Sequence, residues 1–226
     1  MTTIIQPKSN KGSLRDIQVL INDYPLFLES KINKFLKTKP MNIKFVSPLK
    51  NDYVEYRDND FLKALNLPNL TEKLSLFWPK NGPQWDGLGL SDNGKRFLFE
   101  AKANLPELKS PPCKATSKDS ILKIDQAIIE TKKAMSIDIP IDVNWKGQYY
   151  QYTNRLAHLH FLRKNKIDAY LIFIYFVGDK SVNGPNTRNE WFKAIKCAKN
   201  SLSIPVEHNL SRYILDIFID VKDIGF

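Results

Sequence analysis

A continuous apolar run, Ala169–Val177, constrains the fold of this 226-residue chain more than any other feature. The run carries no charged residue and is rich in β-branched and aromatic side chains. A segment of this kind predicts a central strand that is buried on both faces of a sheet. It is far too short to cross a lipid bilayer.

Helical and strand patterns alternate around this run. Apolar spacing predicts helices over residues 13–23, 25–36, 52–65, 120–135, 148–165 and 190–200. It predicts strands over residues 42–46, 74–78, 85–90, 95–103, 169–177 and 213–221, with loops over 106–118 and 178–187. A helix, three strands, a helix and a strand in this order predict an α/β fold with a mixed sheet. Residues 1–12 are expected to form a disordered tail.

The composition describes a basic globular protein. Lys and Arg number 34 against 24 Asp and Glu, which gives a formal charge of +10. Apolar residues make up 42% of the chain and aromatic residues 12%, enough for a sizeable core. Two cysteines support neither a disulfide framework nor a four-cysteine zinc site. The polar N-terminus has no secretory apolar segment, so we expect a cytoplasmic protein without a membrane partner.

The densest chemistry lies in a predicted hairpin. Residues 85–90 and 95–103 flank the turn sequence Asp92-Asn93-Gly94. Because strand side chains alternate between two faces, Glu100 and Lys102 share one face of the second strand, opposite an apolar face. Two charged residues on one face in the middle of an apolar hairpin indicate a functional role.

The turn supplies a register. A three-residue loop with Gly94 in the left-handed conformation pairs Ser91 with Lys95 and places Asp86 directly opposite Glu100. Their Cβ atoms would lie roughly 5 Å apart. Two such carboxylates repel each other, and a hard divalent cation would turn that repulsion into attraction.

Two other registers stay open. A two-residue turn at Asn93-Gly94 would place Asp86 opposite Ala101 instead. A bulge at Gly87 or Gly89 would also shift the pairing. Hairpins that carry Asp, Glu and Lys are most often solvated clusters of cross-strand charges, but the strongly apolar flanking residues argue against that interpretation here.

The spacing resembles that of the PD-(D/E)xK nuclease superfamily. The match is Pro83-Gln84-Trp85-Asp86, then fourteen positions from Asp86 to Glu100, then Glu100-Ala101-Lys102. Two residues between Pro83 and Asp86 depart from the motif's name, a variation that the superfamily widely tolerates. Other segments look like a group of bacterial proteins of unassigned function; they are Phe77-Trp78-Pro79, residues 150–159 and residues 175–179.

The resemblance implies both a fold and a reaction. The fold is a restriction-endonuclease-like αβββαβ core with a mixed central sheet, N-terminal helices and a C-terminal helix–strand extension. In a single domain over residues 13–226, the N-terminal extension covers 13–50, the catalytic core 51–180 and the C-terminal extension 181–226. The reaction is hydrolysis of a phosphodiester with Mg²⁺, or Mn²⁺ in its place. Asp86, Glu100 and the carbonyl of Ala101 would hold the metal, and Lys102 would position the attacking water.

Further residues are candidates for supporting roles. Glu55 lies where the superfamily often places another acidic residue, although a capping role with Asp52 as N-cap explains it equally well. Asp58 is a second choice for that acid and Glu72 a third, weaker one. A histidine-based zinc site is not expected, because His158 and His160 diverge on a helix.

One helix contributes a polar stripe of Gln148, Gln151, Arg155 and His158. In the superfamily this helix packs beside the active site, so Gln151 is a candidate catalytic residue and Arg155 and Gln148 are candidate nucleic-acid contacts. The planar guanidinium of Arg155 is suited to phosphate oxygens. For His158 a solvated helix face is the preferred interpretation.

The leading hypothesis is therefore a magnesium-dependent nuclease acting on DNA more readily than on RNA. Lysines cluster over residues 31–39, 109–123 and 193–199, and together they would add salt-dependent affinity for phosphates. Dimers are common in this superfamily where both strands are cut, so a homodimer is one arrangement that the resemblance allows. A nucleic-acid-binding or protein-interaction module without catalysis is the alternative, and a lysine-rich protein without a nucleic-acid role is a third reading.

Overall fold

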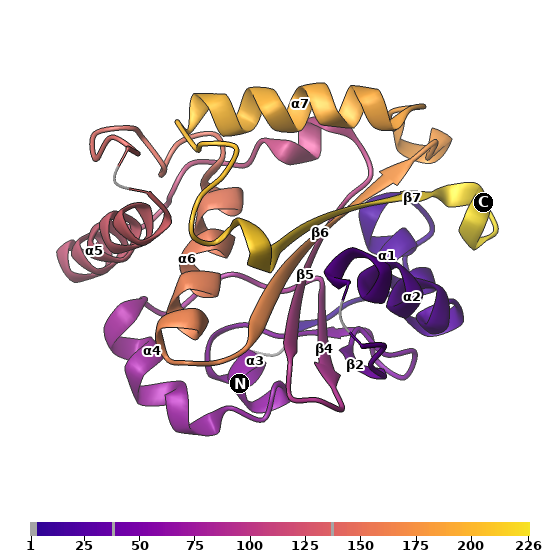
Figure 1. Cartoon of the computed structure of the whole chain (residues 1–226), viewed down its shortest axis with the longest axis horizontal. Coiled ribbons are helices and arrows are strands. Elements are labelled where there is room, and N and C mark those ends of the chain that lie inside the picture. The colour runs from indigo at the N-terminus through magenta and orange to yellow at the C-terminus, as the bar shows by residue number, and fades with distance from the viewer. Residues whose placement is uncertain (1–3, 38, 137) are drawn as a thin grey trace.

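The computed structural model describes residues 4–37, 39–136 and 138–226. Its centre is a five-stranded sheet in the order β2-β4-β5-β6-β7 (Figure 1). The strands are β2 (Ile43–Ser47), β4 (Gly87–Ser91), β5 (Arg96–Lys102), β6 (Ala169–Val177) and β7 (Ile214–Asp220). Strands β2, β4 and β5 pair antiparallel, whereas β5, β6 and β7 pair parallel. The predicted α/β fold with a mixed sheet is confirmed.

Helices cover both faces of this sheet. On one face lie α1 (Gly12–Asp23) and α2 (Pro25–Leu36) (Figure 1). The other face carries the longer helices α5 (Lys118–Met135), α6 (Tyr150–Lys164) and α7 (Arg188–Ser201), with the short α3 (Asp58–Ala64) and α4 (Thr71–Phe77). Short 3₁₀ turns occur at Pro68–Leu70, Leu105–Leu108, Lys180–Val182, Ser211–Tyr213 and Val221–Ile224. The sheet is therefore the middle of three layers.

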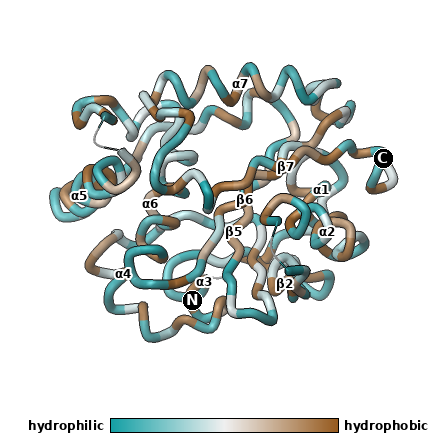
Figure 2. Tube along the Cα trace, in the orientation of Figure 1, coloured by the Kyte–Doolittle hydropathy of each residue, from teal (hydrophilic) through white to brown (hydrophobic). Residues whose placement is uncertain are grey.

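Strand β6 is the centre of the core, as its apolar sequence predicts. All nine of its residues are buried. Phe173 and Tyr175 face the α6 side, and Ile172 and Ile174 face the α1 side. Figure 2 shows hydrophobic residues along β6 and polar residues on the outer helices. In the part of the chain that the structure describes, no helix is both long and apolar enough to span a membrane.

The helix predicted over residues 52–65 is wrong in its first half. Residues Val54–Glu55 form a short strand, β3, and the helix α3 begins only at Asp58. Tyr53 has a left-handed φ of 46°, and the side chain of Asp52 accepts the N–H of Val54 at 3.2 Å. This local turn replaces the expected N-cap, because Asp readily bonds to the backbone two residues ahead.

The strand predicted over residues 74–78 is also wrong. The segment is helical in α4, which buries Leu74 and Phe77 and leaves Leu76 exposed. The alternation of Leu74, Leu76 and Trp78 indicated a strand, but the spacing from Leu70 to Leu74 to Phe77 fits a helical stripe. Packing of that stripe against the core overrides the local alternation.

The tail predicted over residues 1–12 also differs. Residues 1–3 lie outside the described part, but Ile4–Ile5 form strand β1, antiparallel to β3. The side chain of Gln18 accepts the N–H of Ser9 at 2.9 Å and donates to the carbonyl of Pro7 at 3.0 Å. Hydrogen bonds from α1 therefore order a polar segment that has few apolar side chains to bury. The remaining helices and strands lie within two residues of their predicted ends.

Candidate active site

The hairpin adopts the register that the turn predicts. Gly87 pairs with Phe99 and Leu90 pairs with Arg96, with no shift between β4 and β5. The N–H of Ser91 donates to the carbonyl of Lys95 at 3.0 Å, and Gly94 has a φ of 90°. Glycine adopts this left-handed conformation without the steric cost that a Cβ would bring. The three-residue loop is confirmed, and the two-residue turn is not formed.

Asp86 lies one residue before β4, at the point where the two strands separate. Its Oδ2 accepts the N–H of Ala101 at 2.8 Å. The carboxylate therefore caps an unpaired backbone group of β5. Because the N–H and C=O of one strand residue point to the same side, the carbonyl of Ala101 faces Asp86 as well. Two oxygen donors meet at this corner of the sheet.

Glu100 is almost fully buried, at 1% exposure, between two cations. Its Oε1 lies 2.5 Å from Nζ of Lys102, and its Oε2 lies 2.6 Å from Nε of Arg155. Burial alone would raise the pKa of Glu100, but the charges and hydrogen bonds of Arg155 and Lys102 outweigh it and the pKa is lowered. Glu100 is therefore ionised at neutral pH.

Asp86 has the opposite electrostatic balance. Its pKa is raised well above its ordinary value, first by burial and then by the negative charges of Glu100 and Glu55. Lys102 and Arg155 act against this but do not cancel it. Three neighbouring carboxyl groups thus face two cations, which leaves an excess of negative charge in a low-dielectric place.

This donor set fits a hard divalent cation. Asp86 and the carbonyl of Ala101 offer oxygen atoms only, which is the preference of Mg²⁺. The excess negative charge would be relieved by a cation at Asp86. Both oxygens of Glu100 are held in ion pairs, so ligation by Glu100 requires one pair to loosen. Among the described residues, no group of three or more His, Cys, Asp or Glu side chains is arranged to hold a metal.

Helix α6 brings two of the predicted residues into the site. Oε1 of Gln151 accepts from Nζ of Lys102 at 2.8 Å, and its backbone N–H donates to Oγ of Ser110 at 2.9 Å. Arg155 is buried beneath the site, where Nη2 donates to the carbonyl of Gln84 at 2.6 Å. Its guanidinium also stacks 4.9 Å from the ring of Trp85.

Gln148 does not reach the site. It is exposed and lies two residues before α6. Only its backbone carbonyl takes part, by accepting the N–H of Ser110 at 2.7 Å. This contact holds the segment after β5 against the start of α6.

The solvated position expected for His158 is wrong. His158 is 1% exposed and lies in an aromatic cluster, 4.9 Å from the ring of Trp78 and 6.2 Å from that of Trp85. Its Nδ1 lies 2.9 Å from the carbonyl of Asn154. Burial lowers its pKa to about 3, so the ring is neutral. This end of the polar stripe is buried because Phe61 of α3 and Phe77 of α4 pack against the ring of His158.

Of the alternative acids, only Glu55 belongs to the site. It is buried on β3 and accepts hydrogen bonds from the side-chain amides of Gln84 and Gln6. Burial raises its pKa despite these bonds. Asp58 instead accepts the N–H groups of Asn81 and Gly82 at 3.1 and 2.8 Å, which holds the turn before Pro83. Glu72 is exposed on α4.

Gln84 is a site residue that the sequence analysis did not assign. Its side chain bonds Glu55 and its carbonyl bonds Arg155, so it links β3 to α6. Its place two residues before Asp86, inside the motif, was the available signal. For Ser110, in contrast, no sequence pattern indicated a role, because its contact with Gln151 depends on the path of a loop.

A cavity of about 460 Å³ opens over these residues. Asp86, Ala101, Lys102 and Gln151 line its floor, with Lys109 at its rim. A second cleft of about 530 Å³, between Trp78 and the segment 111–117, shares Pro111 and Tyr150 with it. Of the three site carboxylates, Asp86 lines the cavity, whereas Glu100 and Glu55 are buried behind it. Comparisons of the chain with family models, with curated proteins and with solved structures find no match.

Proposed function

We propose that this protein is a metal-dependent nuclease that hydrolyses phosphodiester bonds, with DNA as its substrate. The observation that carries the proposal is the hydrogen bond from Ala101 N–H to Asp86. It holds Asp86 beside Ala101, between the motif residues Glu100 and Lys102. A cavity opens onto Asp86, Ala101 and Lys102.

The topology supports a restriction-endonuclease-like core. Strands β2, β4 and β5 are antiparallel neighbours, α6 follows, and β6 joins β5 in parallel. With α1 and α2 before β2, this order corresponds to αβββαβ. The core on this assignment begins before residue 51, because β2 takes the place of the strand expected over residues 74–78. Helix α7 and β7 form the C-terminal extension.

Each residue of the site has a role in this reaction. Asp86, Glu100 and the carbonyl of Ala101 would hold Mg²⁺, which when bound polarises the phosphoryl group and lowers the pKa of a water molecule. Lys102 orients the attacking water through its ammonium group. Gln151 holds Lys102 by accepting a hydrogen bond at 2.8 Å. The oxygen of water attacks phosphorus and gives its proton to solvent, while the bond from phosphorus to the leaving oxygen breaks and that oxygen takes a proton from solvent.

The contacts of Arg155 favour a positioning role. Its guanidinium binds Glu100, Asn154 and the carbonyl of Gln84, and its side chain is 4% exposed. It fixes the carboxylate of Glu100 beside Lys102 and cannot reach a phosphate without leaving these partners. Glu55 adds negative charge beside Asp86 and so strengthens the attraction for a cation.

The test is cleavage of labelled DNA and RNA, single- and double-stranded, with Mg²⁺ or Mn²⁺. We expect Lys102→Met and Asp86→Asn to lower the rate by about 10²–10⁴-fold, since each removes a group that acts on the reacting atoms. Lys44→Met and Glu72→Gln are controls, because both side chains are exposed and neither lines the cavity over Asp86. Wild-type protein that cuts no substrate with either metal would contradict the proposal.

A binding module without catalysis is the second candidate. The observation that favours it is the complete pairing of Glu100 with Lys102 and Arg155, which neutralises the carboxylate without a metal. On this reading the protein binds nucleic acid in the presence of EDTA, and Asp86→Asn leaves the affinity unchanged. A cleavage rate that depends on Lys102 would exclude it.

A further inference from the structure

A separate cleft lies two strands away from the hairpin, across the outer edge of β7. Its volume is about 560 Å³, and we call it the β7 cleft. Strand β7 is at the end of the sheet, and its outer edge pairs with no strand in the described part of the chain. The cleft shares no lining residue with the cavity over Asp86. Its lining includes Lys31, Lys34 and Phe35 of α2, Lys37 just after that helix, Arg188 of α7 and Phe218 of β7.

The β7 cleft carries fixed positive charge. Lys34, Lys37 and Arg188 are exposed, and no carboxylate pairs with them or with Lys31 among the described residues. The carboxylate of the lining, Asp216, lies 3.0 Å from Nζ of Lys199 and is thereby neutralised. The four cations of the cleft are therefore not neutralised by Asp216, which is already paired with Lys199. An anionic ligand complements such a surface.

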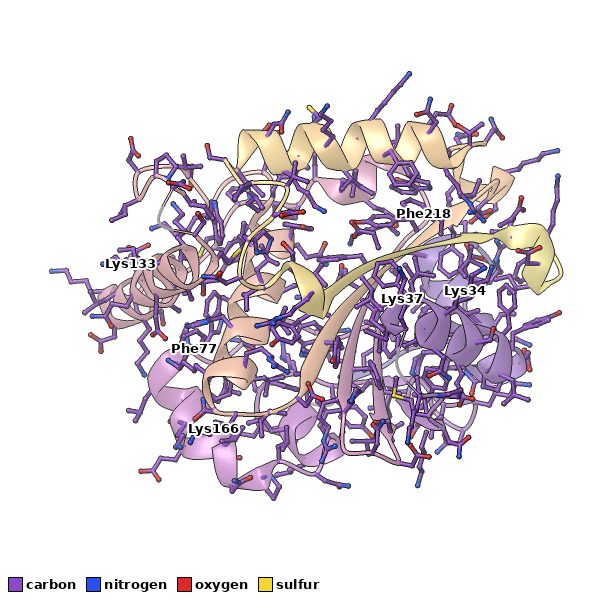
Figure 3. All side chains as sticks on the ribbon, viewed as in Figure 1. Lys34, Lys37, Phe77, Lys133, Lys166 and Phe218 are labelled. Carbon is purple, nitrogen blue, oxygen red and sulfur yellow. The ribbon has the colours of Figure 1, made fainter. Side chains whose placement is uncertain are left out.

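Exposed aromatic rings lie beside these cations. Phe35 is 51% exposed on α2, and Phe192 is 55% exposed on α7. Phe218 of β7 lines the cleft with Phe35, and its ring centroid lies 4.7 Å from that of Phe192. In Figure 3, Phe218 lies on the α7 side of β7, and Lys34 and Lys37 lie on the α2 side. Rings and ammonium groups thus line one continuous path across the strand.

We propose that the β7 cleft binds single-stranded nucleic acid. The lysines and Arg188 would contact phosphates, and unpaired bases would stack on Phe35, Phe192 and Phe218, as in proteins that bind single strands without reading sequence. A duplex keeps its bases stacked inside and leaves the rings unused. An acidic peptide that extends the sheet would need the backbone of β7 but not the rings, so the aromatic lining favours nucleic acid.

The test is fluorescence anisotropy with a labelled oligothymidylate of 20 nucleotides in EDTA. The variant Lys31→Gln/Lys34→Gln/Lys37→Gln should weaken binding at least tenfold at low salt. It should also reduce the slope of log K against log salt by about 2, since each phosphate contact to a single strand contributes about 0.7. The matched control is Lys73→Gln/Lys133→Gln/Lys166→Gln, which removes the same charge from exposed positions outside the β7 cleft. Lys133 and Lys166 lie on the opposite side of the molecule in Figure 3.

The rings are tested separately. Phe35→Ala and Phe192→Ala change exposed side chains, and each should weaken single-strand binding about fivefold or more while the salt slope stays constant. An equal loss in the control variant, or unchanged binding in the triple-lysine variant, would overturn the proposal. So would binding of oligoglutamate, and not of oligothymidylate, to the cleft. Because EDTA excludes metal-dependent cleavage, these outcomes are independent of the nuclease assay.

Discussion

Asp86 is a charged residue held where its charge is disfavoured. Burial, Glu100 and Glu55 all raise its pKa, so the folded protein favours the neutral carboxyl group. A side chain of this kind stabilises the fold less than a neutral isostere would. The structure keeps it at the corner of the hairpin, where its Oδ2 caps Ala101. This unfavourable charge is consistent with the cation site that we propose.

We expect Asp86→Asn to raise the free energy of unfolding at pH 7 by about 1 kcal/mol or more. The amide oxygen can still accept the N–H of Ala101, and the repulsion by Glu100 and Glu55 is removed. The raised pKa means that the folded wild type loses stability as pH rises above the ordinary pKa of an aspartate. Urea denaturation at pH 5 and pH 8 should therefore show a smaller change for the variant. A variant less stable than wild type at pH 8 would argue against this electrostatic account.

Arg155 is the opposite case, a buried cation that stabilises its partner. Arg155→Met should lower the free energy of unfolding by about 3 kcal/mol, because Glu100 keeps its charge in a buried place with one cation fewer. The double variant Glu100→Gln/Arg155→Met should recover part of this loss, which a double-mutant cycle by urea denaturation measures. Strict additivity of the two single variants would show that the pair is not coupled.

At the scale of helices and strands, features set by local sequence were predictable, whereas contacts between distant segments were not. The turn at Gly94 and the burial of β6 followed from local sequence, so the register that brings Asp86 to Glu100 was correct. Glu55 lies on a two-residue strand and Gln84 in a loop. Segments this short have no periodic sequence pattern, so their contact could not be predicted. The burial of His158 was not predicted, because it depends on packing against α3 and α4, and the alternating pattern indicated a strand where α4 forms.

Helix α1 is attached to the end of β6 by a buried ionic cluster. Nη2 of Arg15 lies 2.6 Å from Oδ1 of Asp16 and 3.1 Å from Oδ1 of Asp179. Both carboxyl groups also have a buried oxygen without a hydrogen-bond partner. Burial raises the pKa of Asp16 to about 7; Arg15 opposes this shift, and the charge of Asp179 adds to it. Ser13, at the start of the same helix, lines the cavity over Asp86.

This cluster predicts a pH dependence of stability. The folded state binds a proton at Asp16 more tightly than the unfolded state, in which the pKa is 3.8. The free energy of unfolding should therefore fall by about 2–4 kcal/mol as pH rises from 4 to 7, through this group alone. Asp16→Asn should flatten that part of the profile in urea denaturation at several pH values. Identical slopes for the variant and the wild type would contradict the assignment.

At the scale of the molecule, the central sheet connects the proposed metal site at Asp86 with the β7 cleft. Lys102 of β5 pairs in register with Tyr175 of β6, which pairs with Phe218 of β7. Two strand spacings, roughly 10 Å, thus separate the backbone of the hairpin corner from that of the β7 cleft. The surplus of ten positive charges is consistent with a phosphate-bearing ligand, and its lysines gather on α2 near β7 as well as near the cavity. The lysine clusters were visible in the sequence, but which of them lie on one surface depends on the fold.

The central claim is that Asp86, Glu100 and the carbonyl of Ala101 form a metal site. Anomalous diffraction from crystals equilibrated with Mn²⁺ tests it most directly. We expect one strong peak roughly 2 Å from an oxygen of Asp86 and from the carbonyl oxygen of Ala101, and no peak there in Asp86→Asn crystals. Crystals saturated with Mn²⁺ that show no density at these atoms would contradict the account.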